Sequence, residues 1–384
     1  MGGPSNKVWR TRGPMKADHA SQKQLKYLNA STRRLIWWRY RKHTLAMIGL
    51  VSICGMYFTA LFCEFLAPYN KDTIHLDAIY SPISKIYLFD KDNNLCWPFV
   101  KECRLKLDLE HYKATVIEVP GTRFPIKFFV KGDPYHFWGE WLWDRHLFGV
   151  EKPGTLFLFG ADRMGRDVFS RCLYGTRISL SIGMIGVLMS LLLGVTLGGV
   201  SGYFGGWSDG IIQRVIETIR CFPSIPLWMG LSAAMPPHWP ALKVYFAITI
   251  ILSLVGWTDL ARMVRGKLMS LREEEFVLAA KFIGASDARI IFKHLLPSFM
   301  SHIIVSVTLA IPGMILAETA LSFLGIGLRP PITSLGVLLK EAQNVTTVAL
   351  YPWLLLPVFF VIIIVLSFNF VGDGLRDAVD PYSR

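Results

Sequence analysis

Six long apolar runs constrain the fold of this 384-residue chain more than any other feature. A helix rises about 1.5 Å per residue, so roughly 20 apolar residues cross the ~30 Å hydrocarbon core of a bilayer. Hydrophobic residues make up 52% of the chain and charged residues 18%, which is more apolar surface than a water-soluble core needs. The sequence therefore predicts an all-α polytopic membrane protein with six transmembrane helices at residues 44–66, 178–202, 221–235, 244–259, 303–323 and 350–371.

The third apolar run is the weakest of the six because prolines crowd it. They are Pro223, Pro226, Pro236, Pro237 and Pro240. A proline removes a backbone donor and clashes with the preceding turn, so it kinks or breaks a helix. Such breaks are tolerated in membranes where neighbouring helices satisfy the freed backbone groups. We expect this crossing to be broken or tilted.

The basic residues are spread unevenly, and their distribution predicts the topology. Residues 1–43 contain eleven Lys and Arg against one acid, Asp18, and the segment between the fourth and fifth runs is also basic. Cytoplasmic loops carry an excess of Lys and Arg, so the pattern predicts six crossings with both termini in the cytoplasm. This placement accounts for the net charge of +13, and no nucleic-acid partner is expected.

The predicted topology divides the chain into five parts. They are a basic cytoplasmic segment (1–43), a first transmembrane helix (44–66), an extracytoplasmic insertion (67–160), a five-helix core (161–372) and a cytoplasmic tail (373–384). Within the insertion, β-branched and aromatic stretches at 86–89, 114–119 and 124–130 predict a small strand-containing domain. The Trp- and His-rich stretch 136–146 suits either an interfacial aromatic belt or a contact surface for an external partner.

No sequence motif of an enzyme, a nucleotide site or a metal site is found. GADRMGRD (160–167) has the two glycines of a phosphate loop, but Arg-Asp stands where Lys-Ser/Thr is required. The histidines of the insertion lack the spacing of metal ligands, so we expect no metal and no cofactor on this chain. Cys96 and Cys103 lie in one short external stretch, CWPFVKEC, where an oxidising compartment would favour a disulfide between them.

Residues 273–298, EEEFVLAAKFIGASDARIIFKHLLPS, form a charged, helix-friendly segment between the fourth and fifth runs. We call it the helix-pair segment. Phe276, Ala279, Ala280 and Ile283 recur near helical spacing, which predicts an amphipathic helix over 272–282.

A second helix is expected after Gly284, where the chain would turn through a left-handed conformation. Ser286 can cap this helix, Asp287 would lie in its first turn, and Pro297 would end it.

Three functions suit two short helices that meet at a glycine. A DNA-binding helix-turn-helix has this pattern, but an element tethered to a membrane helix at each end cannot enter a major groove. An amphipathic helix on the lipid surface would favour basic flanks, whereas three glutamates precede this one. Presentation of a shaped surface to a soluble protein partner remains the favoured interpretation.

Three acids near the membrane need separate explanations, because a charge facing lipid is costly. Glu64 and Asp259 lie near the ends of predicted helices and can reach water, so structural or interfacial roles are expected. Glu318 is deeper and could line a path or pair with another helix, including an arginine of a partner. A proton-coupled carrier would ordinarily show internal repeats and several such groups.

The helix-pair segment resembles the EAA loop of ABC-importer permeases, which reads Glu-Ala-Ala, three residues, Gly, nine residues, Ile, one residue and Leu-Pro. The matching residues are Ala279, Ala280, Gly284, Leu296 and Pro297, while Leu278 replaces the glutamate and His294 the isoleucine. Three further motifs are similar to the second permease subunit of dipeptide and oligopeptide importers: GADRMGRDVFSRCLYGTRISLSIG (160–183), ILAETALSFLGIGLRPP (315–331) and FNFVGDGLRDAVDP (368–381).

The resemblance covers about residues 160–381 and the first helix, and it implies a type I ABC-importer permease fold in a bacterial inner membrane. The implied partners are a homologous permease, two ATPase subunits that bind ATP and Mg²⁺, and an external binding protein. This chain would then be no enzyme. The implied cargo is peptides or similar small solutes, with oligosaccharides, opines and nickel chelates as alternatives.

The resemblance also implies that residues 273–297 are a coupling loop gripped by an ATPase subunit. The residues expected to form that contact are Glu275, Ala279, Ala280, Gly284, Ala285, Ser286, Asp287 and Pro297.

Cysteines introduced at Lys131 and Lys281 test the predicted topology. We expect Lys131→Cys to react with an impermeant thiol reagent added to intact cells, because this position is predicted to lie outside. Lys281→Cys should react only after the cells are permeabilised. The opposite labelling pattern, read as a mass shift of the purified chain, would invert the topology.

Overall fold

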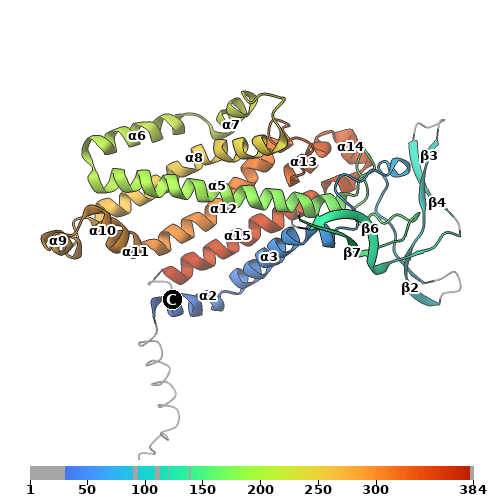
Figure 1. The fold of residues 1–384 in the computed structure, drawn as a ribbon, viewed down its shortest axis with the longest axis horizontal. Coiled ribbons are helices and arrows are strands. Elements are labelled where there is room, and N and C mark those ends of the chain that lie inside the picture. Colours follow the sequence, from blue (N-terminus) through green and yellow to red (C-terminus); the bar gives the residue numbers. More distant parts are fainter. Residues whose placement is uncertain (1–30, 90–93, 109–112, 120, 138–139, 381–384) are drawn as a thin grey trace, which may run out of the picture.

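Five long helices form the body of the molecule in the computed structural model, which describes residues 31–380 except 90–93, 109–112, 120 and 138–139. Within this part, five helices are long and apolar enough to cross a membrane. They are α3 (Thr44–Leu61), α5 (Val168–Phe204), α8 (Ala241–Leu271), α12 (Met300–Phe323) and α15 (Pro357–Val379). Figure 1 shows them side by side in one bundle, so the mostly helical fold is confirmed.

The two ends of this bundle differ in structure (Figure 1). One end, which we call the helix-pair end, carries α9 (Glu275–Phe282), α10 (Asp287–Arg289) and α11 (Leu296–Ser298). The other, the strand end, carries the β-strands. Other short helices are α2 (Thr32–Lys42), α4 (Cys63–Leu66), η1 (Leu76–Ala78), α13 (Leu335–Leu339), η3 (Lys340–Gln343), α14 (Val345–Leu350) and η4 (Pro352–Leu355).

The long helices extend beyond the apolar runs that predict them. α5 begins at Val168 rather than at 178, and α8 continues to Leu271, past the predicted end at Asp259. α15 reaches Val379, so much of the predicted tail 373–384 is helical instead. An apolar run ends at its first charged residues, whereas a helix continues as long as its backbone hydrogen bonds are made.

The predicted third transmembrane helix at 221–235 is not a single helix. α6 (Gly206–Cys221) ends where the run begins, and α7 (Ser224–Ala233) has only ten residues. At 1.5 Å per residue, α7 spans about 15 Å, half of a bilayer core. Phe222 and Pro223 between them have extended backbone angles, which accounts for the break. α6 and α7 together run along the bundle from the helix-pair end toward the strand end (Figure 1).

Glycines bring α5 and α8 into close backbone contact. Gly194, Gly198 and Gly202 repeat every four residues along one face of α5. A Cβ atom at Gly198 would lie 2.4 Å from the Ala261 carbonyl oxygen, and one at Gly202 would lie 2.7 Å from the Arg265 carbonyl oxygen. Small residues at this spacing let two membrane helices approach closely enough for extensive van der Waals packing.

The strand end contains three small antiparallel sheets. They are β1 (Tyr87–Phe89) with β2 (Leu95–Val100) and β5 (Phe124–Pro125), β3 (Cys103–Asp108) with β4 (Lys113–Glu118), and β6 (Lys127–Phe137) with β7 (Trp141–Gly149). The three predicted strand stretches are confirmed. β6 and β7 pack on the end of the first membrane helix, where the Phe65 ring lies 6.1 Å from Phe129 and 6.5 Å from Trp143, centroid to centroid.

The predicted disulfide between Cys96 and Cys103 is wrong, because Cys96 is a free thiol. Cys96 lies on β2 and Cys103 on β3, and these strands belong to different sheets. Proximity in sequence therefore does not bring the two positions together. The chain leaves one sheet at Val100 and enters the next at Cys103.

The loop that resembles a phosphate loop, residues 160–167, is closed by its own carboxylate. Asp162 Oδ1 accepts hydrogen bonds from the backbone amides of Met164 at 2.8 Å and Arg166 at 2.9 Å. The Arg166 side chain donates to Asp162 Oδ2 at 2.8 Å, and Arg171 pairs with the same oxygen. The amides that a phosphate loop would direct at a phosphate are thus occupied within the loop. Asp167 then caps the start of α5.

Replacing Gly198 with valine tests the α5–α8 contact. A side chain there must displace backbone atoms of α8, and overpacking of this kind costs roughly 1–3 kcal/mol or more. We expect Gly198→Val to lower the temperature at which the purified chain loses its monodisperse gel-filtration peak. Gly55→Val is the matched control, because a Cβ atom at Gly55 meets nothing within 4 Å. Equal melting of the two variants would contradict the packing argument.

Candidate coupling site and cavity

The turn of the helix-pair segment is built by local hydrogen bonds around Gly284. This glycine has φ +78°, as the sequence predicts. The amide of Gly284 donates to the Lys281 carbonyl at 3.0 Å, and the amide of Ala285 donates to the Ala280 carbonyl at 3.0 Å. This pair of bonds is the Schellman motif, which satisfies the last carbonyls of α9. The turn is therefore defined by the local sequence.

The second half of the segment begins as predicted and ends differently. The Ser286 hydroxyl caps α10 by accepting the Arg289 amide at 3.4 Å, and Asp287 lies in the first turn. A π-helix at Ile290–Leu295 follows and leads into α11. Pro297 lies inside α11 rather than after it, because the helical turn continues to Ser298. A wider turn before Pro297 fits a residue that cannot donate to the α-helical ladder.

The buried face of α9 differs from the predicted one. Val277 and Ala280 are buried against the cluster that contains Ile290 and Leu295. Phe276, Ala279 and Ile283, which were expected on the same apolar face, are exposed. Val277 and Ala280 are three residues apart, so they lie on the same face of the helix. Ile283 is not on that face because the helix ends at Phe282.

The tip of the helix pair exposes large apolar side chains. Phe282 is 89% exposed and Ile283 is 85% exposed, directly before the turn glycine. Phe292 on the second half is 68% exposed. Adjacent exposed apolar side chains on a polar segment, such as Phe282 and Ile283, are typical of a protein contact site. Glu275 and Ala285 flank the tip, the first exposed and the second half-buried.

Tyr203 supports both halves of the helix pair from α5. Its hydroxyl donates to Asp287 Oδ1 at 2.5 Å, and the Lys281 ammonium lies 5.4 Å from its ring centroid. The ring itself is buried. Sequence reasoning missed Tyr203, because 84 residues separate it from Asp287 and no local pattern links them. The one sequence signal for such a contact is a tyrosine at the polar end of an apolar run, because a buried tyrosine hydroxyl usually needs a hydrogen-bond partner.

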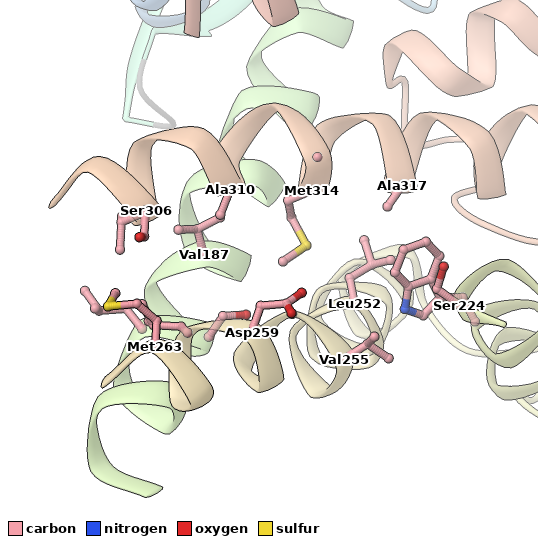
Figure 2. A pocket seen from close by; sticks show the side chains of 17 residues that line it. Val187, Ser224, Leu252, Val255, Asp259, Met263, Ser306, Ala310, Met314 and Ala317 are labelled. Atoms are coloured by element: carbon pink, nitrogen blue, oxygen red, sulfur yellow. The ribbon is translucent and has the colours of Figure 1, made fainter. Parts of the chain in front are cut away.

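A cavity of about 400 Å³ opens between α5, α7, α8 and α12. Most of its lining is apolar, including Trp228, Met263 and Met314. Figure 2 shows the Asp259 carboxylate pointing from α8 across this space toward Met314 of α12. The cavity has the size and apolar character of small-molecule sites in proteins.

Asp259 does not lie near a helix end, which corrects the position expected for it. α8 continues for twelve residues after it, from Leu260 to Leu271. Its side chain is 78% exposed and forms an ion pair with Arg220, the penultimate residue of α6. The apolar run stops at Asp259 because the residue is charged, while the helix itself continues through it.

Glu318 is fully buried and does not line the cavity. Three serine hydroxyls donate to its carboxylate: Ser179 at 3.1 Å, Ser322 at 2.8 Å and Ser334 at 2.7 Å. Of the two roles expected for Glu318, helix pairing agrees with the structure and path lining does not. A partner's arginine cannot reach a carboxylate that is enclosed within this chain.

The same serines fix the backbone around Glu318. Their hydroxyl oxygens accept the amides of Leu335, Leu328 and Val337, at 3.2, 3.0 and 3.2 Å respectively. The network therefore joins α5, α12 and α13 through one carboxylate. A buried polar group is tolerated when its hydrogen bonds are made, and this one accepts three.

Glu64 has a structural role, as expected. Arg177 on α5 donates to both of its carboxylate oxygens, each at 2.5 Å, and also to the Ala60 carbonyl at 2.6 Å. A bidentate arginine–carboxylate pair is among the stronger polar contacts in proteins. This pair ties the end of α3 and the short α4 to α5.

Replacing Glu318 tests its structural role. Glu318→Ala leaves three buried hydroxyls without their acceptor, which costs on the order of 2 kcal/mol or more. We expect a clear fall in the melting temperature of the purified chain, and a smaller fall for Ser334→Ala. Glu217→Gln is the control, because Glu217 pairs with Arg214 on the exposed surface of α6. Unchanged melting of Glu318→Ala together with lost transport would instead favour path lining.

Two protein-family models match the chain. One, described as the inner membrane component of binding-protein-dependent transport systems, matches residues 194–384. The other, described as the N-terminal transmembrane domain of oligopeptide transport permease C, matches residues 31–82. The strand region between them lies outside both matches.

Curated relatives show the same relationship. The oligopeptide transport system permease protein OppC of Bacillus subtilis is 39% identical over 62% of this chain and 76% of its own length. The dipeptide transport system permease protein DppC of that organism is 42% identical over 60% of this chain and 71% of its own. Among solved structures, the inward-facing MetNI methionine ABC transporter matches at 17% identity with a TM-score of 0.44, over 55% of this chain and 97% of the other. By its family models and curated relatives, the chain belongs to the binding-protein-dependent ABC importer permeases and is a permease subunit of the C type, in the inner membrane.

Proposed function

We propose that the helix-pair segment is the surface through which an ATPase subunit drives this permease. The observation that carries the proposal is the exposed apolar tip formed by Phe282 and Ile283 next to the left-handed Gly284. When a matching groove covers exposed phenylalanine and isoleucine side chains, their apolar surface is removed from water, which favours binding. ATP and Mg²⁺ would be bound by that partner, and this chain would bind no cofactor.

The internal contacts of the segment suit it to transmit a force. Val277 and Ala280 anchor α9 to the cluster beneath it, and Tyr203 contacts both halves of the pair. α8 runs from the wall of the cavity to within a few residues of α9. A displacement of the tip by a closing ATPase dimer would therefore reach the cavity through α8 and α5, which pack together as one unit.

The proposed topology has six crossings, with α6 and α7 forming the third. The pair runs along the bundle from the helix-pair end toward the strand end, in the same direction as the long helices (Figure 1). The excess of Lys and Arg in residues 1–43 and between α8 and α12 supports a cytoplasmic location for both termini. The strand region becomes an extracytoplasmic insertion between the first helix and α5.

The proposed cargo is peptides, delivered by an external binding protein to a path shared with a homologous permease. The support is that the relatives described above are named for oligopeptide and dipeptide transport. The cavity beside α7, α8 and α12 is the part of this chain that would line the path. Import of oligosaccharides, opines or metal chelates by the same machinery is the competing possibility.

Substitution of Gly284 tests the coupling role. A Cβ atom at this position meets nothing within 4 Å, so a larger residue acts through backbone strain or against a partner, not through a clash within the chain. A left-handed residue with a side chain costs roughly 1–2 kcal/mol. We expect Gly284→Phe to reduce stimulation of ATP hydrolysis by loaded binding protein about tenfold. Gly284→Asn should lose much less, since asparagine tolerates this conformation.

The measurement uses the complete complex in liposomes, with uptake and ATP hydrolysis recorded on the same preparation. Gly55→Phe serves as the control, because it adds the same bulk at an unobstructed position far from the helix pair. Full uptake by Gly284→Phe would refute the coupling role and leave the lipid-surface helix as the alternative.

A further inference from the structure

The cavity contains one acid whose position calls for a function. Asp259 faces a space lined mostly by apolar side chains (Figure 2). A carboxylate in such surroundings is costly unless water or a cation solvates it. Glu64 and Glu318, the other two acids considered from the sequence, are held by an arginine and by three serines that bind helices together. Asp259 instead has its side chain 78% exposed.

The cation paired with Asp259 is accessible to a competing cation. Arg220 Nη1 donates to Asp259 Oδ1, and both side chains are exposed, at 36% and 78%. The carboxylate and the guanidinium are therefore both open to a ligand that enters the cavity. Arg220 is the penultimate residue of α6, directly before the break between α6 and α7. An entering ammonium group can therefore compete with Arg220 for the carboxylate.

A second polar group, beside the cavity, has no partner in the part of the chain that the structure describes. The indole nitrogen of Trp228 on α7 is buried, and no acceptor for its N–H is found among the residues that the structure describes. Trp228 lines the same cavity as Asp259. A buried donor left without an acceptor costs roughly 1–3 kcal/mol, so a ligand that supplies an acceptor gains from it.

We infer that this cavity binds the free amino terminus of a peptide in transit. Asp259 accepts hydrogen bonds from the ammonium group, which takes the place of the Arg220 guanidinium, and Trp228 donates to a carbonyl oxygen of the peptide. The apolar lining receives side chains without selecting among them. This inference rests on the proposed function and deepens it, because it names the group of the substrate that the permease recognises.

The exchange keeps the charges balanced. Before binding, the carboxylate of Asp259 is neutralised by Arg220, and after binding it is neutralised by the ammonium group. The released Arg220 stays at the end of α6, where its side chain is 36% exposed. Because a substrate with a blocked amino terminus has no cation to offer, it would leave the Arg220–Asp259 pair intact and gain nothing from Asp259.

The test compares import of a tripeptide with a free amino terminus and the same tripeptide N-acetylated. The complete complex is reconstituted in liposomes, with binding protein loaded to saturation with either peptide. We expect Asp259→Asn to slow import of the free peptide about tenfold and to leave the acetylated peptide unchanged. Arg220→Gln should import the free peptide at least as fast as the unaltered complex does. Trp228→Phe should slow both peptides, since both have the carbonyl.

Controls separate a binding role from a structural one. Glu217→Gln removes an exposed acid from α6 and should change neither rate. If Asp259→Asn slows both peptides, Asp259→Glu must restore the free peptide selectively, and failure to do so would overturn the inference. Equal losses in Asp259→Asn and Arg220→Gln would also overturn it, by showing a structural pair. If the unaltered complex imports neither peptide, the proposed function itself is refuted. If the unaltered complex imports normally and Asp259→Asn leaves the ratio of free-peptide to acetylated-peptide import rates unchanged, this inference alone is refuted.

Discussion

The close contact between α5 and α8 is the interaction on which both functional regions depend. Gly198 and Gly202 let the two backbones meet directly, and Gly194 makes room for the Leu260 side chain of α8. Without a hydrophobic driving force between helices in lipid, such packing has to supply much of the attraction. The contact fixes α8 relative to Tyr203, which follows Gly202 directly on α5 and supports the helix-pair segment. It also fixes the α8 wall that carries Asp259.

Charged groups near the membrane fall into two kinds in this structure. Glu318 and Glu64 are surrounded by donors from other helices, and their hydrogen bonds hold α3, α5, α12 and α13 together. Asp259 holds no such network and faces a cavity instead. Enclosure by several donors makes a charge part of the scaffold, whereas exposure to a cavity makes it available to a ligand. Burial therefore distinguishes the two acids of the scaffold from the one that faces the cavity.

The helix-pair segment combines a rigid base with an exposed tip. Its turn is closed by the two bonds of the Schellman motif, and Ser286 caps the second half. The buried side chains Val277 and Ala280 anchor it on one side, while Phe282 and Ile283 are left exposed on the other. A flexible segment would deform when a partner displaced its tip. A segment whose helix ends are hydrogen-bonded and whose base is packed would instead move together with the helices that it contacts.

The sequence alone determined the membrane class, the basic ends, the strand stretches and the local form of the Gly284 turn. Each of these depends on residues close together in the chain: apolar length, charge density, β-branched stretches, and a glycine followed by a capping serine. The same reasoning placed Phe276 and Ile283 on the buried face and Cys96 in a disulfide, and both predictions were wrong. Only the tertiary structure decided which face is covered, that Tyr203 supports Asp287, and that three serines enclose Glu318 while Asp259 faces a cavity. Those outcomes depend on helices far apart in sequence that meet in space, and such meetings follow from packing that no local pattern encodes.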